Sequence, residues 1–200
     1  MTGKPAINIK IPISKETARG LRVGQYVLLN GIVLTARDKV HKYLFSKRPD
    51  AGAMPFSLEG GVIYHCGPII RQSPEGARVI AAGPTTSARM QMYEPFIIEH
   101  YNVRGIMGKG GMSGAVANAM KESGCVYFHA IGGAGALLAQ RIKKVSGVWL
   151  LEEFGPAEAM WAFEVEDFPA VVTIDSQGNS MHRQIEDLSR QRLEEILISG

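Results

Sequence analysis

The stretch Gly83-Pro84-Thr85-Thr86-Ser87-Ala88-Arg89-Met90 follows a short apolar run at residues 79–82 and carries three hydroxyl groups and one arginine. Further along, a lysine lies inside a second turn, Gly108-Lys109-Gly110-Gly111-Met112. An apolar run that ends in such a loop predicts a buried strand followed by a polar turn. A helix beginning in the first loop would offer free backbone N–H groups and its positive dipole end to an anion. Together, the two loops predict a site for a small polyanion such as a dicarboxylate.

The composition indicates a protein that can bury a sizeable core. Of the 200 residues, 46% are hydrophobic and 20% are charged, which suits a single domain over residues 1–200. The net charge of +3 is too small to indicate nucleic-acid binding. The sequence shows neither a signal-peptide region nor an apolar run of membrane-spanning length. We therefore expect a cytoplasmic protein that binds neither nucleic acid nor a membrane.

The cysteines and histidines give weaker indications. Cys66 and Cys125 are not part of a Cys-x-x-Cys motif, and two free thiols fit a reducing compartment. We expect both to be small buried residues, because free cysteine is often buried, and we expect this chain to bind no metal by itself. His65 and His129 lie in strand-like runs, where hydrogen-bonded core or interface histidines are the simpler interpretation. His41 either orients a neighbouring group or lies on a helix face.

Periodicity predicts an α/β fold whose N-terminal part is rich in strands. Strands are expected at residues 6–11, 26–29, 32–34, 62–66, 79–82, 106–107, 126–131, 148–151 and 170–175. Asn30-Gly31, between two apolar runs, predicts a hairpin turn. Helices are expected at residues 36–47, 94–101, 113–123, 134–142 and 156–163, followed by an amphipathic closing helix within residues 182–200. Strands spaced by helices favour crossover connections.

Five motifs stand in the order in which one protein family carries them. They are Ala36-Arg37-Asp38-Lys39-Val40-His41, Tyr64-His65-Cys66-Gly67-Pro68, residues 83–90, residues 108–112, and Gly155-Pro156-Ala157-Glu158-Ala159-Met160-Trp161. On these motifs the chain resembles the β-type subunit of class I fumarate hydratase and L-tartrate dehydratase, the iron–sulfur hydro-lyases, over about residues 5–180. Gln91 departs from the family pattern, which often has an acidic residue there, and the departure bears on the choice of substrate.

The resemblance implies a swivelling β/β/α domain that forms half of a composite active site. In the family, a [4Fe–4S] cluster with one iron not bound by cysteine acts as the Lewis acid, and its cysteines lie in the other subunit. A cluster needs three or four thiolates, so the two cysteines of this chain cannot hold one. We therefore expect an α-type partner subunit that carries the cluster, in a hetero-oligomer such as α2β2.

The resemblance also implies roles for residues in the motifs. The dicarboxylate would be bound by Arg37, Thr86, Arg89, Lys109 and Gly110. The catalytic residues would be Thr85, Arg89 and Lys109, and Thr85 matches the threonine proposed as the catalytic base in the family. Arginine suits a carboxylate because its planar fork can donate two parallel hydrogen bonds.

Each of these residues also has a structural alternative. Arg37 could instead form an ion pair with Asp38 or Glu59. Arg89 could be an ordinary surface arginine and Lys109 a solvated turn lysine, while Thr85 could serve only as a helix N-cap.

The expected reaction is the reversible hydration of fumarate to L-malate. Dehydration of L(+)-tartrate to oxaloacetate is the alternative, since both substrates are four-carbon dicarboxylates that differ by one hydroxyl. A non-catalytic carboxylate-binding scaffold is a third possibility. Finding Arg37, Thr85, Arg89 and Lys109 together favours an enzyme, because a scaffold has no need for all four.

Overall fold

The computed structural model describes residues 5–74 and 76–199 and has a mixed α/β architecture, as the sequence predicted. The strands are β1 Ile7–Lys10, β2 Tyr26–Thr35, β3 Val62–Tyr64, β4 Ile69–Ser73, β5 Gly76–Ala81, β6 Gly105–Gly108, β7 Val126–His129, β8 Ile142–Trp149 and β9 Met160–Ile174. The α-helices are α1 Lys15–Gly20, α2 Asp38–Lys47, α3 Glu94–His100, α4 Gly114–Ser123, α5 Gly135–Ala139, α6 Leu151–Phe154 and α7 Met181–Ser199. Two 3₁₀ turns, η1 Ala51–Ala53 and η2 Ser87–Arg89, complete the elements.

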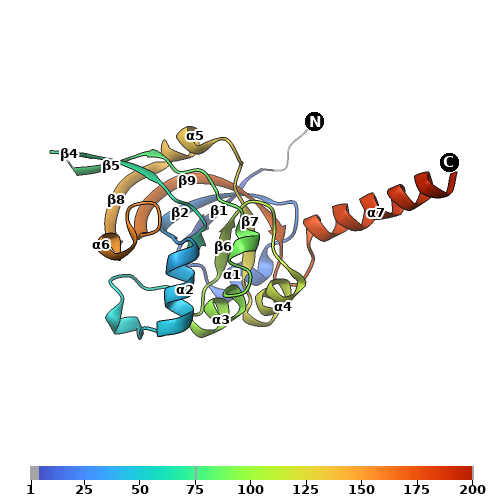
Figure 1. Cartoon of the computed structure of the whole chain (residues 1–200), viewed down its shortest axis with the longest axis horizontal. Helices are drawn as coiled ribbons and strands as arrows, with labels where there is room; N and C mark the ends of the chain where they lie inside the picture. The colour runs from blue at the N-terminus through green and yellow to red at the C-terminus, as the bar shows by residue number, and fades with distance from the viewer. Residues whose placement is uncertain (1–4, 75, 200) are drawn as a thin grey trace.

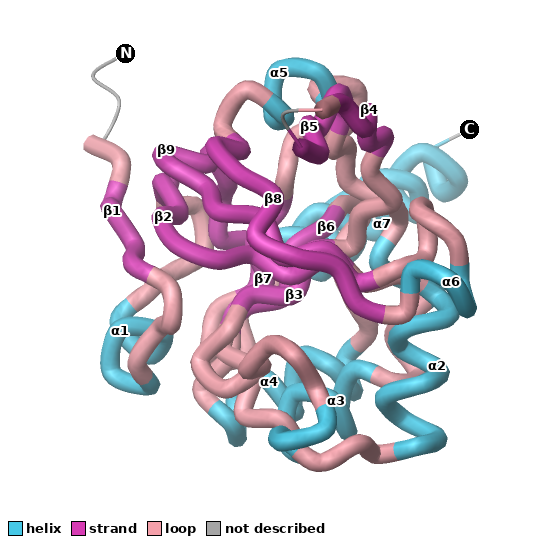
Figure 2. Tube along the Cα trace, turned by 90° about the vertical axis from the view of Figure 1, so that its left-hand side faces the viewer, coloured by secondary structure: helices cyan, strands magenta, loops and turns pink. Residues whose placement is uncertain are grey.

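Five strands of the main sheet close into a ring. The neighbours β2–β3, β3–β6 and β6–β7 are parallel, whereas β9 is antiparallel to both β7 and β2 and so joins the two ends. Strand β1 extends the edge of β2, and β8 extends the edge of β9. Helices α2, α3 and α4 lie together on one side of these strands in both views (Figures 1 and 2). Because β3 and β6 are paired in parallel, they end next to each other.

The alternation of side chains along the strands separates two apolar cores. Val62 and Tyr64 of β3 belong to the core enclosed by the strands, whereas Ile63 belongs to the core between the strands and the helices. Phe128 of β7 faces the first core and Tyr127 the second. This is the two-residue period of a strand that is buried on both faces. The continuous apolar runs of the sequence thus reflect a sheet covered on both sides.

The predicted hairpin at Asn30-Gly31 is wrong, because β2 continues through these residues. The pairing register with β9 shifts between Leu29 and Gly31, which marks a β-bulge. Gly31 has a φ of +122°, and a Cβ there would lie 2.6 Å from the carbonyl oxygen of Ile11. Asn30 supports the bulge by accepting a hydrogen bond from the backbone N–H of Asp167 at 2.9 Å. The glycine is therefore needed for a close backbone approach within the sheet.

The predicted helix at residues 156–163 is also wrong, because β9 begins at Met160. Trp161 and Phe163 face the enclosed core, while Met160 and Ala162 face the helices, so the segment alternates as a strand does. The helix expected at residues 134–142 is shorter, since α5 ends at Ala139 and β8 already begins at Ile142. Pairing of this segment with β2 and β8 prevailed over the helix-start signal of Pro156.

Two elements project from the body of the molecule at opposite ends (Figure 1). The ribbon of β4 and β5 forms a separate two-stranded sheet, so the strand expected at residues 79–82 is not part of the main sheet. Helix α7 carries exposed apolar residues, among them Ile185, Leu188 and Leu193. Among the described residues, no helix combines the length and the apolar character needed to cross a bilayer.

Candidate active site

Residues 84–87 of the first loop lie between the ends of β3 and β6. The loop forms one bridge from Pro84 to Cys66, just beyond β3, and another from Thr86 to Lys109, just beyond β6. The backbone N–H of Thr85 donates to the carbonyl of His65 at 2.7 Å, and that of Ser87 donates to the carbonyl of Lys109 at 3.0 Å. These two N–H groups complete a sheet-like contact and are not free to bind an anion. The helix expected to begin in this loop is the 3₁₀ turn η2 at Ser87–Arg89.

Arg89 lies beside Thr85 at the end of η2. Its Nη2 donates to the Oγ1 of Thr85 at 3.2 Å and to the Oδ2 of Asp38 at 2.9 Å. The Arg89 and Asp38 side chains are each 45% exposed, so solvent and a ligand can reach the pair. Thr85 is not a helix N-cap, because the N-cap position of η2 is occupied by Thr86, whose side chain forms no capping hydrogen bond. The alternative that Thr85 is the helix N-cap is therefore wrong.

Arg37 approaches the same carboxylate from the start of α2. Its Nη2 is 4.0 Å from the Oδ2 of Asp38, and its Nε is 3.2 Å from the Oε1 of Glu158. A Cβ on Gly67 would lie 2.5 Å from the Nη1 of Arg37, so the glycine leaves room for the guanidinium. The expected ion pair with Asp38 is present, and Glu158 takes the place of Glu59 as the second partner. Two guanidinium groups thus converge on one carboxylate.

Lys109 follows β6 and is half-buried. Its stem passes Gly132 in the loop after β7, where a Cβ would be 3.7 Å from the lysine Cδ. Within residues 5–74 and 76–199, no carboxylate lies at salt-bridge distance from its ammonium group. Gly110 has a φ of +84°, which turns the chain directly after the lysine. Lys109 is therefore a cation without a partner of its own in this part of the protein.

A cleft of about 340 Å³ lies beside this turn. Its lining includes Gln91, Gly110, Gly111, His182 and Arg183, so it connects the two predicted loops with the start of α7. A Cβ on Gly111 would lie 2.6 Å from the ring of His182, and the glycine has a φ of +72°. The departure from the family pattern at Gln91 therefore lies in a cleft next to the expected substrate-binding residues.

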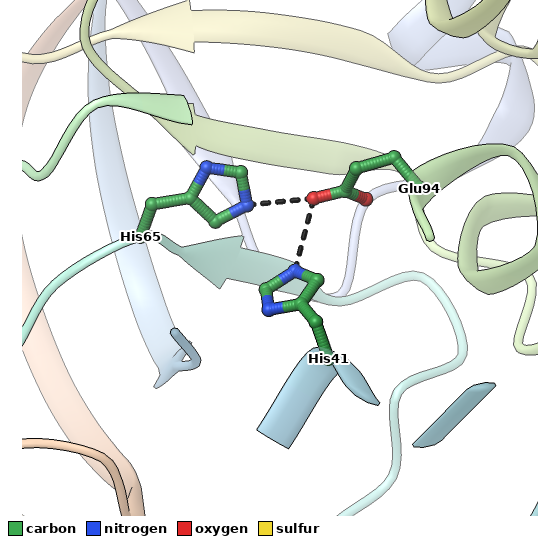
Figure 3. A group of neighbouring side chains, drawn as sticks. All are labelled: His41, His65 and Glu94. Atoms are coloured by element: carbon green, nitrogen blue, oxygen red, sulfur yellow. Dashed lines mark hydrogen bonds and ion pairs between the residues drawn. The ribbon is translucent and has the colours of Figure 1, made fainter. Parts of the chain in front are cut away.

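Two histidines and one glutamate form a buried cluster in which the side chains point toward one another (Figure 3). The Oε1 of Glu94, on α3, is 2.6 Å from the Nε2 of His65 and 3.0 Å from the Nε2 of His41. All three residues have no exposed surface. Sequence reasoning placed His65 correctly in the core and left His41 open, but it missed Glu94. The only signal was a charged residue directly before the apolar residues of a helix.

The cluster continues towards β7 through hydroxyl groups. The Nδ1 of His65 is 2.8 Å from the Oγ of Ser87, which is 2.7 Å from the phenolic oxygen of Tyr127. At the other end, the Nδ1 of His41 is 2.8 Å from the carbonyl oxygen of Arg37. Burial lowers the pKa of His65. Burial also acts to raise the pKa of Glu94, but the charge and hydrogen bonds of the two histidines outweigh it and lower that pKa.

His41, His65 and Glu94 are also a possible set of metal ligands, since their donor atoms lie within 4.8 Å of one another. In the structure these atoms already bond to each other at hydrogen-bond distances, and both Nδ1 atoms have further partners. The geometry is that of a hydrogen-bonded network.

The cysteines do not fit an iron–sulfur cluster on this chain. Cys66 and Cys125 are both free and buried, as the sequence predicted. Burial raises the pKa of the Cys66 thiol to about 12 and also raises that of Cys125, so neither is a ready thiolate. A cluster requires three or four thiolates.

Comparison with known proteins identifies the family. The family described as Fumarase C-terminus matches residues 2–185. A putative fumarate hydratase class I of Geobacillus stearothermophilus is 48% identical over 191 residues, covering 95% of this chain but only 36% of the relative. A putative L(+)-tartrate dehydratase subunit beta of Methanocaldococcus jannaschii is 38% identical, with 92% of this chain and 95% of the relative covered. The L(+)-tartrate dehydratase subunit beta of Escherichia coli K12 is 34% identical, with 93% and 91% covered.

The chain therefore belongs to the Fumarase C-terminus family. It spans about a third of the fumarate hydratase relative and nearly the whole length of the two tartrate dehydratase β subunits.

Proposed function

We propose that the chain is the β-type subunit of an iron–sulfur hydro-lyase and that it supplies the dicarboxylate-binding and proton-transfer residues of a shared active site. The observation that carries the proposal is the convergence of Arg37 and Arg89 on the Asp38 carboxylate, with Thr85 hydrogen-bonded to Arg89. Two guanidinium groups that already hold one carboxylate form a suitable site for a carboxylate of the substrate.

The proposed roles follow from the chemistry of removing water from a hydroxy-dicarboxylate. A proton leaves the carbon beside a carboxylate, and negative charge builds up on that carboxylate in the transition state. Arg37, Arg89 and Lys109 stabilise this charge, because preorganised cations act strongly in a site that excludes water. Thr86 and Gly110 complete the substrate-binding set, and the turn at Gly110 directs the chain after Lys109.

Thr85 is the proposed proton-transfer residue. Its hydroxyl oxygen accepts a hydrogen bond from Arg89 at 3.2 Å, and a nearby cation favours the alkoxide form that a hydroxyl base requires. Departure of hydroxide needs a Lewis acid. Because the cysteines of this chain do not fit a cluster, we assign a [4Fe–4S] cluster to an α-type partner subunit, in a hetero-oligomer such as α2β2. The partner would complete the site from the exposed side of Arg89.

Fumarate hydration to L-malate is the preferred reaction, because the fumarate hydratase relative has the higher identity of the three compared. Tartrate dehydration is the second candidate, because the two tartrate dehydratase relatives match this chain over nearly their full length. Gln91 lies in the cleft beside Gly110, where a polar side chain can distinguish two substrates that differ by a hydroxyl.

The test is anaerobic reconstitution of the purified chain with its cluster-bearing partner. We expect the isolated chain to be colourless and without hydro-lyase activity, and the pair to dehydrate L-malate faster than L-tartrate. A higher rate with L-tartrate would establish the second candidate. Activity of the isolated chain without iron would contradict the composite site. Dicarboxylate binding by a folded but inactive pair would instead support the non-catalytic scaffold.

A further inference from the structure

The donor and the acceptor of each hydrogen bond in the buried cluster can be assigned by starting from the carbonyl oxygen of Arg37. A carbonyl oxygen only accepts hydrogen bonds, so the Nδ1 of His41, at 2.8 Å, must carry a proton. On its other side, the Nε2 of His41 is 3.0 Å from the Oε1 of Glu94. An ionised carboxylate also only accepts, so with Glu94 ionised this nitrogen must carry a proton as well. His41 is then an imidazolium ion.

The remaining groups follow in a single direction. The Nε2 of His65, at 2.6 Å, is the second donor to the Oε1 of Glu94, and with His65 neutral its Nδ1 must accept. Ser87 therefore donates to His65 and in turn accepts from the hydroxyl of Tyr127. The phenolic oxygen of Tyr127 ends the series beside Gly108, where a Cβ would lie 3.2 Å from it. Each donor in this series has one acceptor.

We propose that His41 and Glu94 are positioning residues: a buried imidazolium–carboxylate pair from which a hydrogen-bonded chain holds the substrate-binding segments in register. One end of this series of hydrogen bonds is the backbone of Arg37, its middle is Ser87 in the loop of Thr85 and Arg89, and its far end is Tyr127, whose hydroxyl lies against Gly108 directly before Lys109. This positioning role rests on the proposed function, whereas the protonation pattern does not.

Two further observations support the pair. The side chains of the network are completely buried: His41, His65, Ser87, Glu94 and Tyr127. If one charge of the pair were removed, water could not reach the other charge to stabilise it. The second oxygen of Glu94, Oε2, is buried without a hydrogen-bond partner among the described residues, so the side chains that hydrogen-bond the carboxylate there are the two histidines. Among the neighbouring titratable groups, the carboxylate of Asp38 is paired with Arg89, and burial raises the pKa of the Tyr127 phenol and of the Cys125 thiol, which leaves these two neutral.

Gly108 is the position that makes the junction possible. A Cβ there would collide with the Oγ of Ser87 and would lie 3.2 Å from both the Nδ1 of His65 and the phenolic oxygen of Tyr127. The glycine before Lys109 therefore leaves room for the hydroxyl that links the two halves of the chain of hydrogen bonds. This gives the first glycine of the Gly-Lys-Gly-Gly turn a purpose that the anion-binding interpretation did not supply.

The protonation pattern can be measured on the full chain without the partner. In nitrogen-15 spectra of histidine-labelled protein at pH 8, we expect His41 to carry protons on both ring nitrogens and His65 to be neutral with its proton on Nε2. Variants His41→Gln and His65→Gln would assign these signals to His41 and His65 respectively. A neutral His41, or a His65 with its proton on Nδ1, would overturn the proposal whatever the activity of the assembled enzyme.

The positioning role is tested by Glu94→Gln, which keeps the shape and removes the charge, with Glu99→Gln as the control on the exposed side of the same helix. Because small misplacements of binding groups carry large losses, we expect kcat/KM of the reconstituted enzyme to fall by on the order of 100-fold. We expect the loss to appear in both kcat and KM, and the Glu99 variant to match the unmodified protein. Should Glu94→Gln fold and retain normal kinetics while His41 is doubly protonated in the unmodified chain, the pair has no positioning role.

Discussion

Replacing Gly108 by alanine tests the packing of the site with a single added methyl group. The new Cβ would overlap the Oγ of Ser87, and the neighbouring atoms of His65 and Tyr127 would be 3.2 Å away. None of these three side chains can swing into solvent, because each is completely buried. The methyl group must therefore displace Ser87 and break at least one of its two hydrogen bonds.

The cost can be worked out from these contacts. Overpacking a well-packed core costs about 1–3 kcal/mol, and a buried hydroxyl without its partner costs about 1–3 kcal/mol more. The sum predicts a loss of roughly 2–6 kcal/mol in the free energy of unfolding. For a chain of this size each kcal/mol lowers the melting temperature by about 2–4 °C, so we expect a decrease of at least about 4 °C.

The assay is thermal and urea unfolding of the purified chain, with Gly114→Ala as the matched control. Gly114 begins α4, and nothing lies within 4 Å of a Cβ at this position. Alanine is the better helix former, by up to about 1 kcal/mol, so the control should unfold at the same temperature or slightly higher. If the Gly108→Ala and Gly114→Ala variants unfold at the same temperature, Ser87 can move freely and the packing argument is refuted.

Three further results are expected. Arg89→Lys retains the charge but loses the planar fork, so the reconstituted enzyme should lose much of its kcat and bind the dicarboxylate more weakly, and near-normal steady-state kinetics for Arg89→Ala would show that the clamp is wrongly placed. Thr85→Val keeps the β-branched shape and removes the hydroxyl, so turnover should be abolished with an unchanged melting temperature, whereas a lowered melting temperature with normal turnover would make Thr85 structural. The free energy of unfolding should fall on acidification in two stages. The pKa of His65 is lowered in the folded protein, so the stability that this residue contributes is lost as the pH falls below 6.5, the ordinary pKa of histidine. The pKa of Glu94 is also lowered, so the stability that it contributes is lost as the pH falls below 4.5, the ordinary pKa of glutamate. Urea titrations across this range measure the decrease, and in Glu94→Gln the second stage should be smaller; an equal slope in both proteins would contradict the assignment.

Much of the architecture was predictable because burial leaves a periodic trace in the sequence. Helices α2, α3 and α4 follow the predicted ranges closely, and Gly124 ends α4 in the left-handed conformation that glycine adopts readily. Errors arose where a local signal had two structural meanings. Asn30-Gly31 can form a turn or a bulge, and the pairing of β2 with β9 decided for the bulge.

The sequence named candidate site residues, whose roles stay predictions, but it did not give their geometry. Arg37 and Arg89 were identified as cations of the site, yet the carboxylate that both approach, Asp38, was considered only as a partner of Arg37. The bridges from residues 84–87 to both strand ends were likewise unforeseen, because the loop follows the β4–β5 ribbon and not a strand of the main sheet.

By itself, the sequence determined the α/β class, the cationic loops and the inability of two cysteines to hold a cluster, because composition and local periodicity suffice for these. The tertiary structure alone decided the closure of the strand ring through β9 and the assembly of the buried charge pair. Glu94 lies 53 positions from His41 and 29 from His65 in the sequence. No local pattern records such a contact, since it exists only when α2, the end of β3 and α3 pack together and exclude water from the charges they bring.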